Sequence, residues 1–109
     1  MGMEFVHVRL SREELRELLA SLRSRLKEVD SRLREVESRL RMFEEKYGVG
    51  TSEFLEIIRK SEEREVKWPF PDDADMDLIE WEGYARLRSE LLRERKGIER
   101  LIAKLGGSH

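Results

Sequence analysis

Five carboxylates in one short stretch are the residues of this chain that could most readily do chemistry. They are Asp72, Asp73, Asp75, Asp77 and Glu80. Carboxylate oxygens are the ligands that Mg²⁺ and Ca²⁺ prefer. The spacing lacks the Asp-x-Asp-x-Asp-Gly loop with a distal Glu, and the N-terminus of a helix also favours acidic residues because its dipole stabilises negative charge. We interpret the stretch as the start of a helix and predict no metal site.

A second acidic group, Glu13, Glu14 and Glu17, lies in the segment EELRE. It resembles the metal-binding helix of all-α nucleotide pyrophosphohydrolases of the MazG type, which bind Mg²⁺ through E-E-x-x-E and a later E-x-x-D. The chain contains no E-x-x-D, so half of that motif is missing. A metal-dependent hydrolase of this kind is the alternative function from the enzyme class, and a capping box is the structural interpretation of the same glutamates.

Other catalytic chemistry finds little support in the composition. The chain has no Cys, which excludes disulfides, thiol nucleophiles and cysteine metal sites. His7 is the only internal histidine, and nothing in the sequence supplies the orienting group and pocket that a general base requires. There is also no glycine-rich phosphate loop. We therefore predict a protein that is not an enzyme and has no cofactor.

The charge pattern restricts the partners further. Charged residues make up 42% of the 109 residues, but 22 Lys+Arg against 24 Asp+Glu leave a formal net charge of -2, which argues against a nucleic-acid partner. No apolar run reaches the roughly 20 residues that span a bilayer, and the start of the chain lacks the apolar core of a signal peptide, so we predict a cytoplasmic protein. The absence of Asn and Gln with abundant Glu and Arg is typical of a thermophilic prokaryote.

The first elements that the sequence predicts are a strand and a long helix. Residues 3–10 are rich in β-branched and aromatic side chains and predict a short strand. Ser11 with Glu14 forms a capping box that begins a helix over about 12–47. Its apolar residues recur by threes and fours, as in a coiled coil: Leu15, Leu19, Leu22, Leu26, Val29, Leu33, Val36, Leu40, Phe43 and Tyr47.

The middle of the chain predicts a corner. Gly48 suits the left-handed position that ends a helix, and Thr51 can cap a second, shorter helix over about 52–63. Residues 64–76 contain both prolines of the chain, which force extended backbone and predict a loop.

The last element is a second long helix. Asp77 as N-cap with Glu80 three residues later predicts a second capping box, and the apolar spacing continues the helix to about 105. The ending GGSH, residues 106–109, is typical of an added expression tail. We predict one helical domain over 1–105.

These elements together predict a mainly α fold. Two long helices joined through a short tip helix make an antiparallel, coiled-coil-like helical hairpin, with the N-terminal strand outside it. The apolar surface is too wide for one partner helix to cover, so we predict a homodimer that forms a helical bundle. The residues assigned to the dimer contact are Leu22, Leu26, Val29, Leu33, Val36 and Leu40.

Two resemblances suggest functions. The segment EFVHVRLSREELRELL resembles the beginning of ribbon-helix-helix DNA-binding proteins, which implies a DNA-binding regulator as a further alternative. The segments FEEKYGVGTSEFLEII and DLIEWEGY, within residues 43–87, resemble small helical prokaryotic proteins that look like the antitoxin half of toxin–antitoxin pairs. This second resemblance implies a non-catalytic protein that neutralises a toxin, encoded by a neighbouring gene, by direct binding.

The proline-containing segment supplies the candidate binding site for that partner. Trp68 and Phe70 are expected to project from a backbone that two prolines hold extended, which lowers the entropy cost of presenting them. Asp72 and Asp73 add negative charge beside them, as a basic partner would require. We predict that these four residues bind the partner protein.

Overall fold

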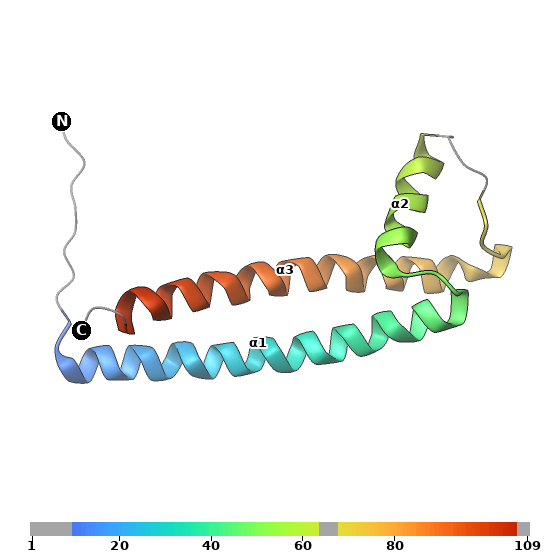
Figure 1. The fold of residues 1–109 in the computed structure, drawn as a ribbon. Helices are drawn as coiled ribbons and strands as arrows, with labels where there is room; N and C mark the ends of the chain where they lie inside the picture. The colour runs from blue at the N-terminus through green and yellow to red at the C-terminus, as the bar shows by residue number, and fades with distance from the viewer. Residues whose placement is uncertain (1–9, 64–67, 107–109) are drawn as a thin grey trace, which may run out of the picture.

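The computed structural model describes residues 10–63 and 68–106, which form an all-α hairpin (Figure 1). The elements are α1 (Arg12–Tyr47), α2 (Thr51–Glu62), the short 3-10 helix η1 (Asp72–Ala74) and α3 (Asp75–Gly106). Helices α1 and α3 lie side by side and antiparallel, and α2 stands across them near one end. The predicted antiparallel hairpin with a short middle helix is confirmed.

Two predicted segments fall mainly outside the described residues. Of the strand predicted over 3–10, only Leu10 is described, and it has no regular secondary structure. Of the tail predicted over 106–109, only Gly106 is described, and it is the last residue of α3. We call the end of the hairpin that carries α2 the closed end, and the opposite end, where α1 begins and α3 finishes, the open end.

Both ends of α1 follow the predicted capping chemistry. The Ser11 hydroxyl accepts from the Glu14 N–H at 3.0 Å, and the Glu14 carboxylate accepts from the Ser11 N–H at 3.0 Å. Hydrogen bonding to Ser11 lowers the pKa of the Glu14 carboxyl group. The backbone of Ser11 is the larger cause, and its side chain is the smaller one. At the other end Gly48 has φ 73°, and its N–H donates to the Glu44 carbonyl at 2.8 Å. The predicted long helix is confirmed in type and extent.

The heptad stripe of α1 is buried within the chain itself. Val29, Leu33, Val36 and Leu40 are buried in the core shared with α3, and Leu22 and Leu26 are half-buried. A dimer contact through these residues stays a prediction. It would require the hairpin to open, because α3 already covers the four buried side chains.

The beginning of α2 differs from the prediction. Thr51 is the first helical residue and Gly50 is the N-cap, which makes no side-chain hydrogen bond. The Glu44 carboxylate of α1 takes the capping role instead, accepting from the Thr51 N–H at 2.8 Å and from Thr51 Oγ1 at 2.9 Å. A long-range contact therefore replaces the local cap, and it ties α2 to the end of α1.

The beginning of α3 also differs. The predicted loop over 64–76 ends early, since η1 occupies Asp72–Ala74 and α3 begins at Asp75. Asp77 is not an N-cap: its Oδ2 accepts from Lys46 Nζ and from Tyr47 Oη, both at 2.6 Å. The Lys46 bond, and after it the Tyr47 bond, lower the pKa of Asp77. The prediction of a second capping box is wrong. The Asp77 carboxylate accepts hydrogen bonds from side chains at the end of α1 instead of from backbone N–H groups at the start of α3.

Trp81 is the centre of the closed-end core. It is fully buried and stacks on Phe54 of α2 with ring centroids 3.9 Å apart, while Phe43 and Tyr47 of α1 stack on it at 5.8 Å. Its indole N–H donates to Thr51 Oγ1 at 3.0 Å, so the polar atom of this buried ring is satisfied. Trp81 therefore joins α1, α2 and α3 in one aromatic core.

Candidate protein-binding site

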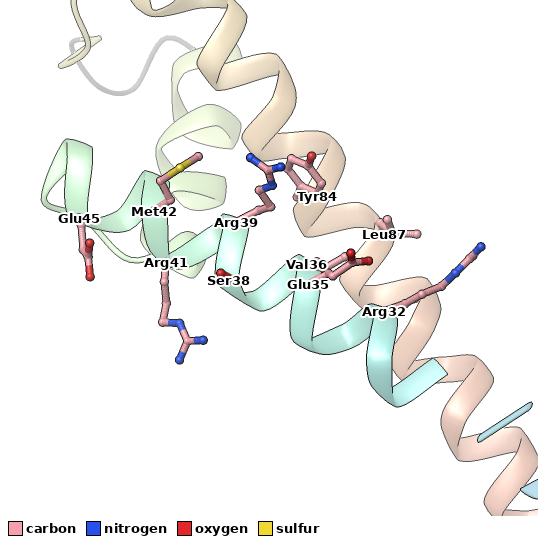
Figure 2. Close-up of a pocket in the computed structure, with 10 residues that line it drawn as sticks. All are labelled: Arg32, Glu35, Val36, Ser38, Arg39, Arg41, Met42, Glu45, Tyr84 and Leu87. Atoms are coloured by element: carbon pink, nitrogen blue, oxygen red, sulfur yellow. The ribbon is translucent and has the colours of Figure 1, made fainter. Parts of the chain in front are cut away.

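A shallow groove runs along one side of the seam between α1 and α3 (Figure 2). Its apolar residues are Val36, Met42, Tyr84 and Leu87. Its charged residues along α1 include Arg32, Glu35 and Arg39. Arg41 and Glu45 line it as well (Figure 2). The groove, which we call the seam groove, has no histidine and no cysteine, and its open shape does not enclose a small molecule.

A second surface gathers exposed apolar side chains at the closed end. Trp68 is 40% exposed, Met76 70% and Ile79 66%. Trp68 and Ile79 line a shallow pocket of about 300 Å³ together with Ile58 of α2. We call Trp68, Met76, Ile79 and Ile58 the closed-end patch. Large apolar side chains exposed together are typical of sites that bind other proteins.

The aromatic core supports this patch from below. The Trp68 ring lies edge-on to Phe70 with centroids 5.1 Å apart. Phe70 in turn makes edge contacts with Tyr47 at 5.7 Å and with Phe54 at 5.8 Å. Trp68 is thus connected to Trp81 through a continuous set of packed rings. Because packed rings of this kind fix one another's orientation, Trp68 is held in place while one side of it stays open to solvent.

Negative charge surrounds the patch. The segment from Asp72 to Glu82 carries six acidic residues and no Lys or Arg. Asp77 is paired with Lys46, and Glu82 with Arg86 at 3.0 Å. The other four acidic residues make no ion pair with any described residue. They are Asp72, Asp73, Asp75 and Glu80. All four are exposed, so their charges face solvent beside the apolar surface.

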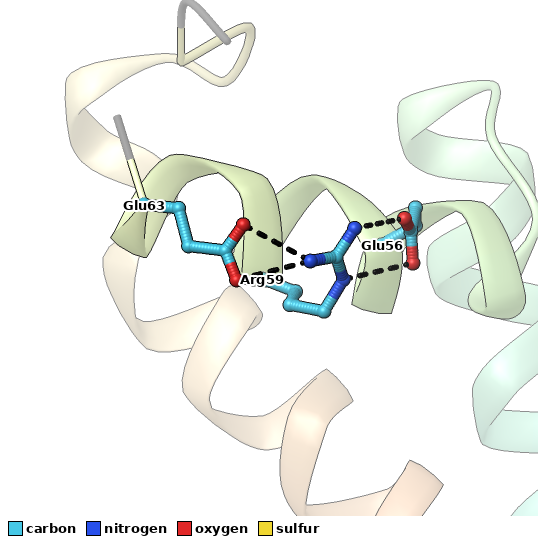
Figure 3. A network of polar contacts seen from close by, with 3 residues as sticks. All are labelled: Glu56, Arg59 and Glu63. Carbon is cyan, nitrogen blue, oxygen red and sulfur yellow. Dashed lines mark hydrogen bonds and ion pairs between the residues drawn. The ribbon is translucent and has the colours of Figure 1, made fainter. Parts of the chain in front are cut away.

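An ion-pair network lies on the neighbouring face of α2 (Figure 3). The Arg59 guanidinium donates to both oxygens of Glu56, with Nη2 to Oε1 at 2.6 Å, and Arg59 Nη1 donates to both oxygens of Glu63 at 3.0 Å. These carboxylates, with the Glu56 hydrogen bond as the largest cause, raise the pKa of Arg59. The three side chains are half exposed, so the network contributes little stability. It occupies Arg59, one of the two cations of α2; the other is Lys60.

The structure separates the residues that the sequence assigned to partner binding. Trp68, Asp72 and Asp73 lie on the exposed surface of the closed end. The expectation that Phe70 projects from the segment is wrong, because Phe70 is only 8% exposed and packs in the core. Sequence reasoning missed Ile79, although its place on α3 beside Leu78, a core residue, widens the apolar face beyond what one neighbouring helix can cover.

The acidic residues considered as metal ligands do not converge. Within residues 10–63 and 68–106, no three His, Asp or Glu side chains are grouped so that they could hold a metal ion. Glu13, Glu14 and Glu17 lie exposed on the first turns of α1, and Glu14 is engaged by Ser11. His7 lies outside the described residues. α1 continues to Tyr47 without the early break that a ribbon-helix-helix fold has after its first helix.

Comparisons with known proteins add no family. No protein-family model, no curated protein and no solved structure matches this chain. Among the helices of the described residues, none combines the length and the apolar content that crossing a membrane requires.

Proposed function

We propose that this protein is a non-catalytic interaction module that binds a basic protein through the closed-end patch. The observation that carries the proposal is the exposure of Trp68, Met76 and Ile79 beside four carboxylates that have no ion-pair partner among the described residues. Aromatic and large apolar anchors inside a polar rim are typical of binding hot spots. Unpaired negative charge favours a partner with a positive surface and accelerates its association.

The support beneath the patch strengthens the proposal. Ordering a flexible aromatic side chain on binding costs free energy, which a prearranged anchor avoids. Trp68 meets this condition, since Phe70 contacts its ring and Pro69 and Pro71 restrict the backbone on either side. The patch therefore combines an exposed anchor with a rigid base.

The particular partner that we propose is a toxin encoded by a neighbouring gene. The resemblance of residues 43–87 to antitoxin-like proteins suggests this role, and a toxin that acts on RNA would have the basic surface that the acidic rim requires. The protein would then neutralise the toxin by covering that surface, with no chemistry of its own.

The test is a titration of the purified product of the adjacent gene with variants of this protein. Trp68→Ala and Ile79→Ser should each weaken binding by about tenfold or more, the effect of losing a hot-spot side chain. Leu101→Ser is the matched control, because Leu101 is 43% exposed on the same helix but lies at the open end. Unchanged affinity for both patch variants, with folding verified by circular dichroism, would contradict the proposal.

The acidic rim has its own signature. Asp72→Asn combined with Asp73→Asn should slow association more than it speeds dissociation, because exposed rim charges act mainly on the encounter rate. Association of the unchanged protein should also slow as salt is raised, since salt screens exposed charges over about 8 to 10 Å. An association rate that neither change affects would contradict a basic partner.

A further inference from the structure

The two sides of the seam between α1 and α3 are built differently. On one side Glu37 pairs with Arg88 at 3.6 Å and Asp30 pairs with Arg95 at 3.0 Å, so charges bridge the two helices. On the other side lies the seam groove, where Met42 is exposed and Tyr84 is half-buried (Figure 2). On the groove side the ion pairs lie beyond the two ends of the groove, from Arg25 to Glu94 and from Lys46 to Asp77, both at 2.6 Å. Among the described residues no ion pair bridges the helices along the groove itself, so this stretch of the seam is the less completely covered one.

Charges alternate in sign along the α1 edge of the groove. The residues in order are Arg25, Glu28, Arg32, Glu35 and Arg39. Steps of three and four residues keep all five on one side of the helix. Arg25 is already engaged, with Glu28 at 2.9 Å and with Glu94 of α3 at 2.6 Å. Arg32, Glu35 and Arg39 make no ion pair with any described residue, so three charges of alternating sign remain available.

We propose that a second copy of this chain covers the seam groove, with its α1 antiparallel to the first and the two-fold axis passing between Arg32 and Glu35. In this register Arg32 of each copy faces Glu35 of the other, and Glu28 of each copy faces Arg39 of the other. Every charge of this row except Arg25 then meets the opposite charge, and Arg25 keeps its bond to Glu94 within its own chain.

The charge order favours a second copy over another protein. Consider a row of charges that alternate in sign, and a second copy of the row turned end for end about a point between a positive and a negative residue. Each charge then faces the opposite charge of the other copy. This is the self-complementary, isologous contact of a two-fold dimer. A uniformly basic partner would leave Arg32 and Arg39 opposed by like charge, and a uniformly acidic partner would do the same to Glu35. The alternating row therefore disfavours binding of a uniformly basic partner and of a uniformly acidic one.

The contact is also large enough. In the proposed register residues 20–47 of the two α1 helices overlap, a length of about 40 Å at about 1.5 Å per residue. Two helices side by side are about 20 Å wide, so each copy would cover roughly 800 Å², the typical size of a stable interface per partner. Val36 and Leu87 of the groove supply apolar contact nearer the two-fold axis, and Met42 adds apolar contact farther out, opposite Arg25 of the other copy.

This dimer leaves Trp68 and Ile79 of the closed-end patch accessible, whereas Met76 lies on the groove side of α3, eleven residues from Leu87 and therefore within about 20° of it around the helix. Tyr84 and Leu87 of the groove lie about 200° around α3 from Glu82 and Ala85, which face α2, at about 100° per residue. Trp68 and Ile79 of the patch share their pocket with α2. The inference thus stands apart from the proposed function, and each can fail without the other.

Charge reversal tests the register directly. Sedimentation equilibrium of the unchanged protein should give twice the chain mass of 13.0 kDa. Arg32→Glu alone and Glu35→Arg alone should each weaken dimerisation by at least about tenfold, because each places like charges opposite one another twice per dimer. The double variant Arg32→Glu/Glu35→Arg should dimerise as the unchanged protein does, and an equimolar mixture of the two single variants should form a mixed dimer. Arg34→Glu, at an exposed position of α1 that does not line the groove, should leave the mass unchanged.

Three outcomes would overturn the inference. They are a monomer mass for the unchanged protein at about 100 µM, single variants that dimerise as tightly as the unchanged protein, and a mixture of single variants that stays monomeric. Circular dichroism of each variant separates loss of dimer from loss of fold. Both substituted residues are exposed, so the fold is expected to survive.

Discussion

The two ends of the hairpin are made from the same two helices but are packed differently. At the closed end, Phe43, Phe54 and Trp81 are almost completely buried. At the open end, Leu15 and Leu19 are half-buried, and the exposed large apolar residues are Leu10, Leu18 and Leu101. The difference has a structural cause, because α2 supplies a third wall at the closed end, whereas two helices alone cannot enclose their own apolar stripes.

The closed end has both the more complete core and the patch that we propose for partner binding. The closed-end patch lies on the part of the chain with the most complete core, so its anchors have a rigid base. The open end has a thinner core and should open more readily. We therefore expect the closed end to be the most stable part of the hairpin, and it is also the end that carries the proposed binding patch.

The largest expected effect comes from removing the central ring. Trp81→Ala should reduce the free energy of unfolding by about 3 to 5 kcal/mol, because it leaves a cavity between Phe54 and Phe43. Leu19→Ala at the half-buried open end should cost clearly less, about 1 kcal/mol. Chemical denaturation of both variants measures the difference, and equal losses would remove the contrast between the ends.

A smaller effect is expected from the polar contact inside the closed end. Thr51→Val removes the hydroxyl that accepts from Trp81 Nε1 and donates to Glu44, and should cost about 1 to 3 kcal/mol because the buried indole N–H loses its partner. Thr51→Ser keeps the hydroxyl and should cost much less. If the valine and serine variants are equally stable by denaturant titration, the hydrogen bonds do not hold α2 in place.

Two glycine substitutions should move stability in opposite directions. Gly97 lies within α3 toward the open end with open space around it, so Gly97→Ala should stabilise the helix by about 0.5 to 1 kcal/mol. Gly48 has φ +73°, so Gly48→Ala should destabilise the closed end by about 1 kcal/mol. Thermal melts of both variants check the signs, and the same sign for both would contradict the assignment of Gly48 as an αL cap.

The smallest expected effect is a pH dependence at Asp77. Because Lys46 and then Tyr47 lower its folded pKa, Asp77 contributes stability above the ordinary Asp pKa of about 3.9, and this contribution is lost as pH falls through the folded value. The difference in Tm between the unchanged protein and Asp77→Asn should therefore shrink from about pH 7 to about pH 3. Asp75→Asn is the control, since Asp75 is exposed and has no ion-pair partner among the described residues. A difference that stays constant with pH would exclude the charged contact.

Local patterns in the sequence predicted those parts of the fold that depend on neighbouring residues. The capping box of Ser11 and Glu14 and the left-handed Gly48 are decided within one helical turn, and both are confirmed. Asp77 and Glu80 have the same spacing as the first capping box, but that prediction is wrong. Asp77 bonds residues 30 and 31 positions away, and no local pattern contains those partners.

The candidate site could be predicted only in part for the same reason. The composition around Trp68 pointed to the correct segment, but which aromatic residue stays exposed depends on the positions of Tyr47 and Phe54, which bury Phe70. The heptad stripe was predicted correctly as apolar, yet spacing alone does not distinguish a partner helix in the same chain from one in a second copy. The structure places α3 against Val29 to Leu40.

Native-state hydrogen exchange tests the central claim that the closed end is the most stable part of the chain. Amides within α1 and α3 around Phe43 and Trp81, and those of α2 around Phe54, should exchange only through global unfolding. Amides around Leu19 and Leu101 should exchange through local opening, at a free energy lower by at least about 1 kcal/mol. Open-end amides that are protected as strongly as those around Trp81, or more strongly, would contradict the account.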